Sequence, residues 1–420
     1  MHHFEYKKGE LFAEDVSIKS LTEEYGTPLY IYSASTFRQH FKAFDSAFAG
    51  IPHLTCYSAK ANSNLSVLKL LAGEGAGTDI VSGGELFRAL RAGVPPEKIV
   101  YSGVGKQEPE IREALYAGIL MFNVESRQEL EKIDRVAADL GMVAKVSLRI
   151  NPDVDPKTHP YISTGLKENK FGLSIPEALE TYQVAKDMRN VDPVGMDCHI
   201  GSQLTTIEPF LEALERLKNF NAKLKDMGIT IKYLDLGGGL GITYEEEEPP
   251  HPEELGQALV QALNGLDLTL ILEPGRVIAG NAGILVTEVQ YTKQTDDKKF
   301  VIVDAGMNDL LRPSLYGSYH RIAEVTPAGR TAETVDVVGP ICESGDFLAK
   351  DREISGLEPG DLLAVFSSGA YGFTMSSQYN SRARAAELLV DGEKVIVARR
   401  RELYQDLVAA EEDGLRSMAE

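Results

Sequence analysis

The sequence predicts an α/β protein: a closed, TIM-like (β/α)8 barrel with a second, C-terminal β domain. Between residues 54 and 275, short β-rich runs alternate with helical patterns, as in barrel folds. After residue 280 the helical pattern gives way to segments of alternating apolar and polar residues, which indicate strands of another domain. A doubly wound open sheet is the main alternative, but a single mononucleotide-type sheet seldom needs eight strands.

Eight β-rich runs define the predicted barrel. They lie at residues 54–60, 77–82, 98–104, 120–126, 145–152, 194–201, 231–238 and 268–275. Most of the gaps between them carry an amphipathic helix. In residues 126–141, for example, Leu130, Ile133, Val136 and Leu140 form one apolar stripe. Eight strands alternating with helices over about 220 to 250 residues are typical of a closed barrel.

The β-rich segments after residue 280 predict the second domain. They lie at residues 283–292, 299–306, 334–340, 362–368 and 387–398. The last of them contains Asp391 and Gly392, a residue pair typical of a two-residue hairpin turn. Residues 399–418 are predicted to form a terminal helix, with Arg399, Arg400 and Arg401 on a solvated or salt-bridged face.

Charge and cysteine content exclude several functions. The formal net charge is −20, and no basic cluster suggests a nucleic-acid or membrane surface. The N-terminus has no apolar stretch after its charges, and no run of 18 apolar residues occurs, so we expect a cytoplasmic protein. Cys56, Cys198 and Cys342 are too few and too widely spaced for a disulfide framework or a metal site.

Unusual residues gather at the carboxyl ends of the predicted barrel strands, the rim from which barrel active sites are built. These residues are Lys60, Asp79, Ser82, Arg149, Asn151, His199, Gly237 to Gly239, and Glu273 to Arg276. Each of them alone has an ordinary structural explanation, because Gly and Pro end many strands and single lysines are usually solvated. Their coincidence on one rim favours a catalytic site.

The rim residues suggest pyridoxal phosphate as the cofactor. Gly237 to Gly239 let backbone N–H groups approach a phosphate, and Arg276 can bind it with two hydrogen bonds. Lys60 can form a Schiff base with an aldehyde, and we expect burial to keep its amine deprotonated by lowering its pKa. Glu273 can hold the pyridine nitrogen in its protonated form, so that the ring accepts electrons. His199 can lie flat against the ring.

Nine motifs, taken together and in order, resemble a known family. They are "YSAKAN", "SGGEL", "KFGL", "HIGSQ", "LDLGGG", "EPGR", "RPSLYGSYH", "CESGD" and "GAYGF". This set is similar to the fold-type III pyridoxal-phosphate-dependent decarboxylases, and within them to the members that act on diaminopimelate. The resemblance runs from about residue 26 to about residue 371 and covers most of the chain.

The resemblance implies an alanine-racemase-like arrangement. Residues 36–280 would form the barrel, and residues 1–35 would join 281–420 in the β domain. The chain would form a head-to-tail homodimer with shared active sites. The reaction implied is decarboxylation of meso-2,6-diaminopimelate to L-lysine and carbon dioxide, the last step of lysine biosynthesis, through a Schiff base with pyridoxal 5'-phosphate. No metal is implied.

The resemblance also assigns roles to individual residues. Lys60 would hold the cofactor, and Cys342, from the neighbouring subunit, would donate a proton. The implied cofactor-binding residues are Lys60, Asp79, His199, Ser202, Gly237, Gly238, Gly239, Glu273, Gly275, Arg276 and Tyr371. The implied substrate-binding residues are Arg276, Arg312, Tyr316, Tyr371 and Glu343, with Glu343 again from the neighbouring subunit.

Other functions remain open on this fold. Decarboxylation of ornithine, arginine or carboxynorspermidine is the first alternative, although these substrates have no need of a clamp made by Arg312 and Tyr316. Glu273 disfavours an amino-acid racemase, because racemases of this type have a pattern with arginine, rather than glutamate, at the pyridine nitrogen. A non-catalytic homologue is disfavoured because Lys60 and Cys342 are both present. A Schiff-base aldolase would bind no pyridoxal phosphate.

Overall fold

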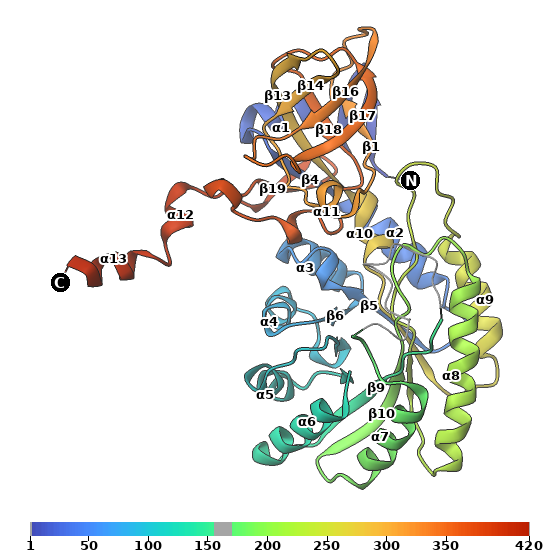
Figure 1. The fold of residues 1–420 in the computed structure, drawn as a ribbon. Coiled ribbons are helices and arrows are strands. Elements are labelled where there is room, and N and C mark those ends of the chain that lie inside the picture. The colour runs from blue at the N-terminus through green and yellow to red at the C-terminus, as the bar shows by residue number, and fades with distance from the viewer. Residues whose placement is uncertain (1, 155–169, 420) are drawn as a thin grey trace. The chain divides into compact units, whose positions relative to one another are not determined.

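The computed structural model describes residues 2–154 and 170–419 (Figure 1). The chain divides into two compact units. One comprises Arg38–Ile278, and the other combines Met1–Phe37 with Ala279–Glu420. Among the described residues, no helix is both long and apolar enough to cross a membrane.

The first unit is a closed barrel of eight parallel strands, which confirms the predicted fold. Its strands are β5 (His53–Ser58), β6 (Gly77–Ile80), β7 (Ile99–Tyr101), β8 (Met121–Val124), β9 (Ala144–Arg149), β10 (Val191–Asp197), β11 (Tyr233–Asp235) and β12 (Thr269–Leu272). Each strand pairs with the next along the chain, and β12 closes the ring by pairing with β5. Strands such as β6 and β8 are buried along their whole length, as expected when helices cover a parallel sheet.

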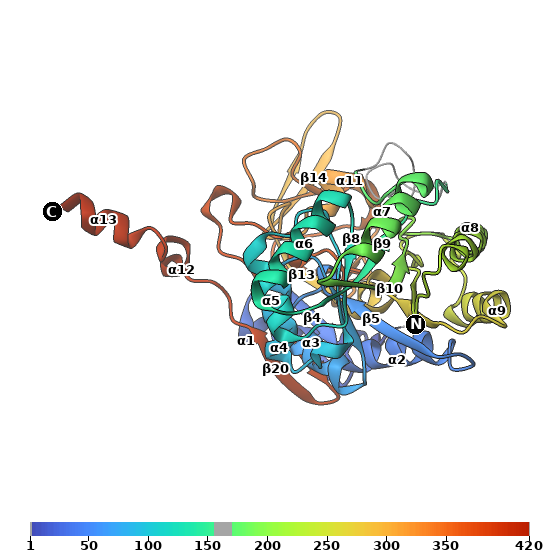
Figure 2. The same ribbon diagram turned by 90° about the horizontal axis from the view of Figure 1, so that it is seen from below.

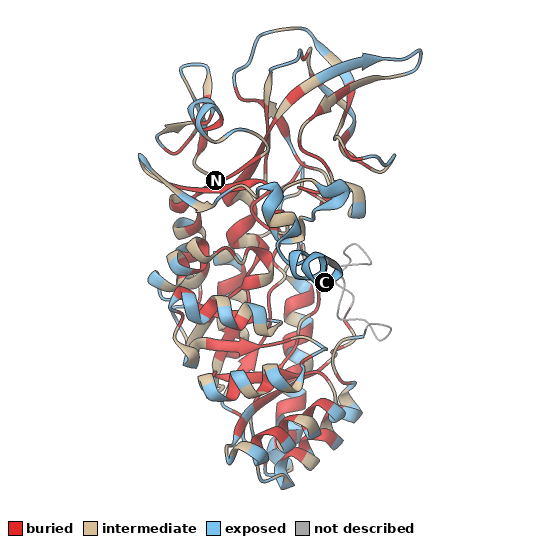
Figure 3. Ribbon diagram, turned by 90° about the vertical axis from the view of Figure 1, so that its left-hand side faces the viewer, coloured by how far each residue is buried: buried red, intermediate tan, exposed pale blue. Residues whose placement is uncertain are grey.

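Helices surround these strands (Figure 2). They are α2 (Ala34–Ser46), α3 (Leu65–Gly73), α4 (Gly83–Ala92), α5 (Glu108–Ala117), α6 (Arg127–Leu140), α7 (Ile175–Asp187), α8 (Glu208–Asp226), α9 (Pro252–Leu263) and the short α10 (Arg276–Ala279). Local signals set their ends. The Ser126 side chain caps the N-terminus of α6, and Gly141 ends the helix in the left-handed conformation. Burial concentrates on the strands and on the helix faces that cover them (Figure 3).

The second unit is built on β sheets. Its nine-stranded sheet contains β4 (Leu29–Ser33), β13 (Gly283–Gln294), β14 (Lys299–Val303), β15 (Ile322–Glu324), β16 (Ala332–Val338), β17 (Phe347–Ser355), β18 (Leu362–Val365), β19 (Ala386–Asp391) and β20 (Lys394–Arg399). Its three-stranded sheet contains β1 (Phe4–Lys7), β2 (Glu10–Ala13) and β3 (Val16–Ser17). The helices α1 (Ile18–Tyr25) and α11 (Arg312–Tyr316) complete the core of the unit.

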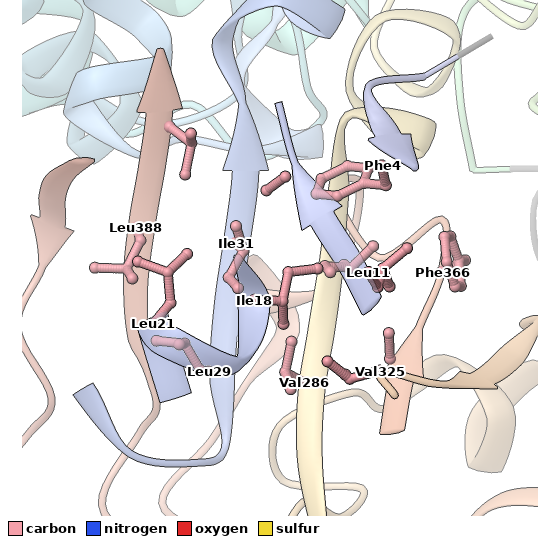
Figure 4. Packing of buried hydrophobic residues seen from close by; sticks show 14 of the residues in the cluster. Phe4, Leu11, Ile18, Leu21, Leu29, Ile31, Val286, Val325, Phe366 and Leu388 are labelled. Atoms are coloured by element: carbon pink, nitrogen blue, oxygen red, sulfur yellow. The ribbon is translucent and has the colours of Figure 1, made fainter. Parts of the chain in front are cut away.

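The N-terminal segment is part of this sheet rather than an appendage. Strand β4 pairs antiparallel with β13 and parallel with β19, so residues from both ends of the chain share one sheet. Side chains from these segments form one buried cluster, which includes Leu11, Ile31, Val286 and Leu388 (Figure 4). Each Å² of apolar surface buried in this cluster contributes about 25 cal/mol to the packing between these distant segments.

Two local predictions in this unit differ from the structure. Asp391 pairs with Lys394, so the hairpin turn is Gly392–Glu393, one residue later than expected. The reason is that Gly392, with φ of 62°, takes the first turn position, where a positive φ is needed. The predicted terminal helix is two short helices, α12 (Tyr404–Val408) and α13 (Glu412–Ala419). Arg399 belongs to neither, because it ends β20, where it forms an ion pair with Glu387.

Candidate active site

Lys60 and Asp79 meet at the carboxyl ends of β5 and β6. Lys60 lies in a short helical turn directly after β5, and its Nζ is 2.7 Å from Oδ2 of Asp79. Ser58 Oγ donates to the same oxygen at 2.7 Å. Oδ1 of Asp79 is buried and accepts no hydrogen bond from the described residues. The sequence led us to expect that Lys60 is buried, but its side chain is 33% exposed and forms an ion pair with Asp79.

Glu273 lies in a hydrogen-bond network of side chains from β8, β11 and the residue after β7. Its Oε1 accepts hydrogen bonds from Ser102 Oγ and Asn123 Nδ2, both at 3.2 Å. The Asn123 amide also donates to Oδ2 of Asp235 at 3.0 Å, which ties two buried carboxyl groups to one side chain. Sequence reasoning placed Glu273 on the rim but missed Ser102, Asn123 and Asp235, because their strands are separated along the chain.

Burial and neighbouring carboxyl groups raise the pKa values of both Glu273 and Asp235. Burial, then the negative charges of Asp235 and Asp79, raise the pKa of Glu273 well above its ordinary value. Burial and Asp197 raise the pKa of Asp235 to about 7. A cation beside Glu273 would reverse this effect by stabilising its ionised form. The pair is therefore suited to bind a protonated ring nitrogen.

The His199 ring is neutral, and its tautomer is determined by one hydrogen bond. Loss of hydration and the nearby cations Arg149 and Lys60 lower the pKa of His199 well below its ordinary value. Its Nδ1 accepts a hydrogen bond from the N–H of Gly238 at 3.1 Å, so the ring proton is on Nε2. A neutral, oriented imidazole can lie against an aromatic cofactor ring without adding a charge.

The three-glycine loop after β11 is shaped by close packing. A Cβ on Gly238 would lie 2.2 Å from the carbonyl oxygen of Glu273, and one on Gly237 would lie 2.4 Å from Nδ1 of His199. The N–H groups of Gly237 and Gly238 donate to Asp235 Oδ1 and His199 Nδ1. Among the described residues, the N–H of Gly239 donates to no protein acceptor. Of the three glycines predicted to hold a phosphate, Gly239 is therefore the one whose N–H can donate a hydrogen bond to an anion.

Arg276 and Ser202 come together as the sequence predicted, with a third residue that it missed. Arg276 Nη2 and Nε donate to Ser202 Oγ at 3.1 and 3.3 Å. Arg276 Nη1 donates to the Tyr244 hydroxyl at 2.7 Å, and the guanidinium lies 5.8 Å from the centre of that ring. Tyr244 precedes the acidic segment 245–255. Its place directly after the glycine loop was the available signal.

The remaining rim residues support the site or the fold. Arg149 forms a buried ion pair with Glu125 at 2.7 Å and lies 4.0 Å from Asp197. Burial and neighbouring acids raise the pKa of Asp197 well above its ordinary value. Ser82 caps the N-terminus of α4, and Asn151 Oδ1 accepts from the Asp153 N–H. Ser82 and Asn151 thus have structural roles.

Apart from Arg276, the residues predicted to bind substrate lie in the other unit. Arg312 and Tyr316 belong to α11, and Ser314 Oγ donates to the carbonyl of Gly345 at 2.6 Å, which joins this helix to the loop that carries Cys342 and Glu343. The Cys342 thiol is exposed, and its backbone N–H donates to Asn380 Oδ1 at 2.8 Å.

The same unit holds the remaining predicted side chains. The Tyr379 hydroxyl donates to Glu343 Oε2 at 2.8 Å. Tyr371 has a φ of 55°, a conformation that non-glycine residues seldom adopt and that is typical of functional loops. The structure therefore gathers the predicted residues into two groups, one in each unit.

The barrel matches a family of known cofactor chemistry. Residues 34–280 match the family described as "Pyridoxal-dependent decarboxylase, pyridoxal binding domain". This range spans all eight barrel strands and the residues at their carboxyl ends. The fold and the rim thus define the class, a pyridoxal-dependent decarboxylase.

Relatives along the whole chain narrow the class. A diaminopimelate decarboxylase from Pseudomonas aeruginosa is 55% identical over 98% of this chain and 99% of its own length. The crystal structure of diaminopimelate decarboxylase from Helicobacter pylori complexed with L-lysine is 49% identical, with a TM-score of 0.91 over 94% of this chain and 99% of that one. The structure from M. jannaschii in co-complex with L-lysine is 41% identical, with a TM-score of 0.93 over 98% of both chains.

The chain belongs to the diaminopimelate decarboxylase family. The family resemblance, the fold and the enzyme class predicted from the sequence are confirmed.

Proposed function

We propose that this enzyme decarboxylates meso-2,6-diaminopimelate to L-lysine and carbon dioxide with pyridoxal 5'-phosphate as cofactor. The observation that carries the proposal is the 55% identity, over nearly the full length, to a diaminopimelate decarboxylase. The solved relatives that contain L-lysine are consistent with the same product.

The barrel residues fit pyridoxal phosphate. Lys60 would hold it covalently, the neutral His199 ring would lie against it, and Glu273 would face its ring nitrogen. Gly239, Gly275, Ser202 and Arg276 would bind the phosphate. The fit rests on the unsatisfied Asp79 Oδ1, on the raised pKa of Glu273 and on the tightly packed glycine loop. When bound, the cofactor supplies a ring that accepts the electrons of the bond to the departing carboxylate.

Protons in the site are controlled by groups of known position. Asn123 holds Glu273 and Asp235 so that the pair can balance a cationic ring nitrogen with one negative charge. The ammonium of Lys60 can leave its proton with Asp79, 2.7 Å away, when it attacks a carbonyl. The exposed thiol of Cys342 would donate the proton that replaces the carboxylate.

The residues of the second unit match the ends of diaminopimelate. After one amino-acid centre has reacted, one carboxylate and one ammonium group remain. Arg312, with Tyr316 beside it, would bind the carboxylate, and Glu343 would bind the ammonium. Tyr371 and Arg276 would complete the substrate site. Ornithine and arginine have no second carboxylate and would leave the buried Arg312 without a ligand.

We also propose a cytoplasmic homodimer in which Cys342 and Glu343 complete the site of the neighbouring subunit. Exposed apolar side chains on the C-terminal helices support a protein partner: Tyr404, Leu415 and Met418 are 78%, 67% and 85% exposed. All three cysteines are free thiols, as expected in a reducing compartment.

Release of carbon dioxide from a panel of amino acids tests the function. The enzyme should process meso-diaminopimelate with a kcat/KM at least roughly 10²-fold above those for ornithine, arginine and carboxynorspermidine, because unmatched buried polar groups discriminate strongly. Lys60→Ala protein serves as the blank. Faster release from any of the three competing substrates would contradict the proposal.

A further inference from the structure

His320 lies directly against Arg312 in the interior of the β domain. The His320 side chain is fully buried, and Arg312 is only 5% exposed. Arg312 Nε is 3.4 Å from Nε2 of His320, and Arg312 Nη2 donates to Ser318 Oγ at 3.2 Å. On the other side of the ring, His320 Nδ1 lies 2.9 Å from the carbonyl oxygen of Phe366. The ring therefore links the guanidinium to the backbone after β18.

These contacts allow one protonation state of the ring. A guanidinium has only donors and a carbonyl has only acceptors. Nε2 of His320 must therefore accept from Arg312, and Nδ1 must carry the proton that is donated to Phe366. A ring protonated on both nitrogens would turn an N–H toward the Arg312 guanidinium and add a second positive charge. His320 is thus a neutral acceptor for Arg312.

The backbone around His320 is firmly held. Gly317 ends α11 in the left-handed conformation, with φ of 62°, which turns the chain back so that His320 reaches the first residue of the helix. Arg352 Nη1 donates to the His320 carbonyl at 2.8 Å, and the Phe366 N–H donates to the Arg321 carbonyl at 2.8 Å. The segment that carries the acceptor for Arg312 is therefore tied to its surroundings by hydrogen bonds on both sides.

We propose that His320 is a positioning residue that fixes the Arg312 guanidinium for capture of the carboxylate that the reaction leaves in place. An arginine side chain has many rotamers, and binding would otherwise have to overcome the entropy of fixing one of them. The contacts to Nε and Nη2 orient the plane of the guanidinium before the ligand arrives. This inference rests on the proposed function, because it takes Arg312 as the carboxylate ligand.

Three substitutions at His320 separate positioning from simple packing. In His320→Gln, the amide oxygen can occupy the place of Nε2 and still accept from Arg312. In His320→Asn, the amide nitrogen can occupy the place of Nδ1 and donate to Phe366, but nothing reaches Arg312. His320→Phe retains the ring shape and removes both hydrogen bonds. Val325→Ala, a fully buried position in the same unit, controls for a general loss of stability.

Steady-state kinetics and inhibitor binding give the readout. We expect His320→Asn and His320→Phe to raise KM for meso-diaminopimelate roughly ten-fold, equivalent to about 1.4 kcal/mol, with little change in kcat. We expect His320→Gln to restore KM to within about three-fold of the wild-type value. The inhibition constant of L-lysine should rise in parallel with KM. That of cadaverine, which has no carboxylate, should not change.

The outcomes separate the two proposals. If the wild-type protein releases no carbon dioxide from diaminopimelate, the proposed function fails, and this inference fails with it. If the wild type is active but the Asn and Gln variants have the same KM, only the role of His320 is refuted. The same holds if the inhibition constants of cadaverine and L-lysine rise equally in the variants. Should the Phe variant not fold, the comparison of Asn with Gln is still decisive.

Discussion

Replacement of Gly238 by alanine tests the reading of the glycine loop most directly. The added Cβ would lie 2.2 Å from the carbonyl oxygen of Glu273, whereas ordinary contact begins at 3.4 Å. The glycine loop and the chain at Glu273, directly after β12, must therefore separate by roughly 1.2 Å. The Gly237 carbonyl accepts the Glu273 N–H at 2.8 Å, so that shift strains the backbone which orients the Glu273 carboxyl group. It also moves the Gly238 N–H away from His199.

The expected magnitude follows from these contacts. Overpacking of a rigid site costs about 1 to 3 kcal/mol. In a unit of this size, that lowers Tm by about 2 to 12 °C. A displacement of about 1 Å among catalytic groups lowers kcat/KM by roughly 10²-fold. The affinity for pyridoxal phosphate should fall with it, because the same loop carries the N–H of Gly239.

Gly105→Ala is the matched control, because nothing lies within 4 Å of a Cβ at that position in the same unit. Thermal unfolding, titration with pyridoxal phosphate followed by absorbance, and carbon dioxide release should be measured for both variants. The reasoning is refuted if Gly238→Ala matches Gly105→Ala in Tm, cofactor affinity and kcat/KM.

Three further predictions concern the ionisable and nucleophilic groups. Lys60→Ala should lose the visible absorbance of covalently held cofactor, and its kcat should fall at least about 10³-fold. A variant with normal absorbance and activity would rule out Lys60 as the residue that holds the cofactor. A mixture of Lys60→Ala and Cys342→Ala chains should regain about a quarter of wild-type activity, because half of the dimers are mixed and contain one intact site of two; an inactive mixture that contains mixed dimers would contradict shared sites. For cofactor-free protein, the raised pKa of Asp235 means that its protonated form favours folding, so the stability it contributes is present below about pH 4 and is lost as pH rises through about 7. In Asp235→Asn the free energy of unfolding should therefore fall less over that range, although Glu273 and Asp197 keep part of the slope; an unchanged slope in denaturant titrations would contradict the raised pKa of Asp235.

Much of the fold could be predicted because its signals are local. The predicted helix at 126–141 corresponds to α6 (Arg127–Leu140), since Ser126 and Gly141 cap it through contacts with the adjacent turns. The hairpin at residues 387–398 was predicted from the same kind of signal, but its turn is one residue later. The turn is one residue later because Gly392, rather than Asp391, takes the first turn position, which needs a positive φ.

The types of residue at the candidate site could also be predicted, whereas their partners could not. Lys60, His199 and Glu273 stand out because each follows a β-rich run. The contacts that define their chemistry involve other strands: Asp79 for Lys60, Gly238 for His199, and Asn123 for Glu273. Hydrogen bonds between residues so far apart along the chain leave no pattern in a single sequence.

The sequence by itself determined the order of the strands and helices, the sheet-rich second domain and the lysine, glutamate and histidine on the barrel rim, because periodicity and strand ends are properties of neighbouring residues. Only the tertiary structure decided that Lys60 is ion-paired with Asp79, that burial and nearby carboxyl groups raise the pKa of Glu273, and that His320 lies against Arg312. Charge and hydrogen bonding act through space, and their effect on each group depends on burial and on partners that folding alone brings within 3 to 4 Å.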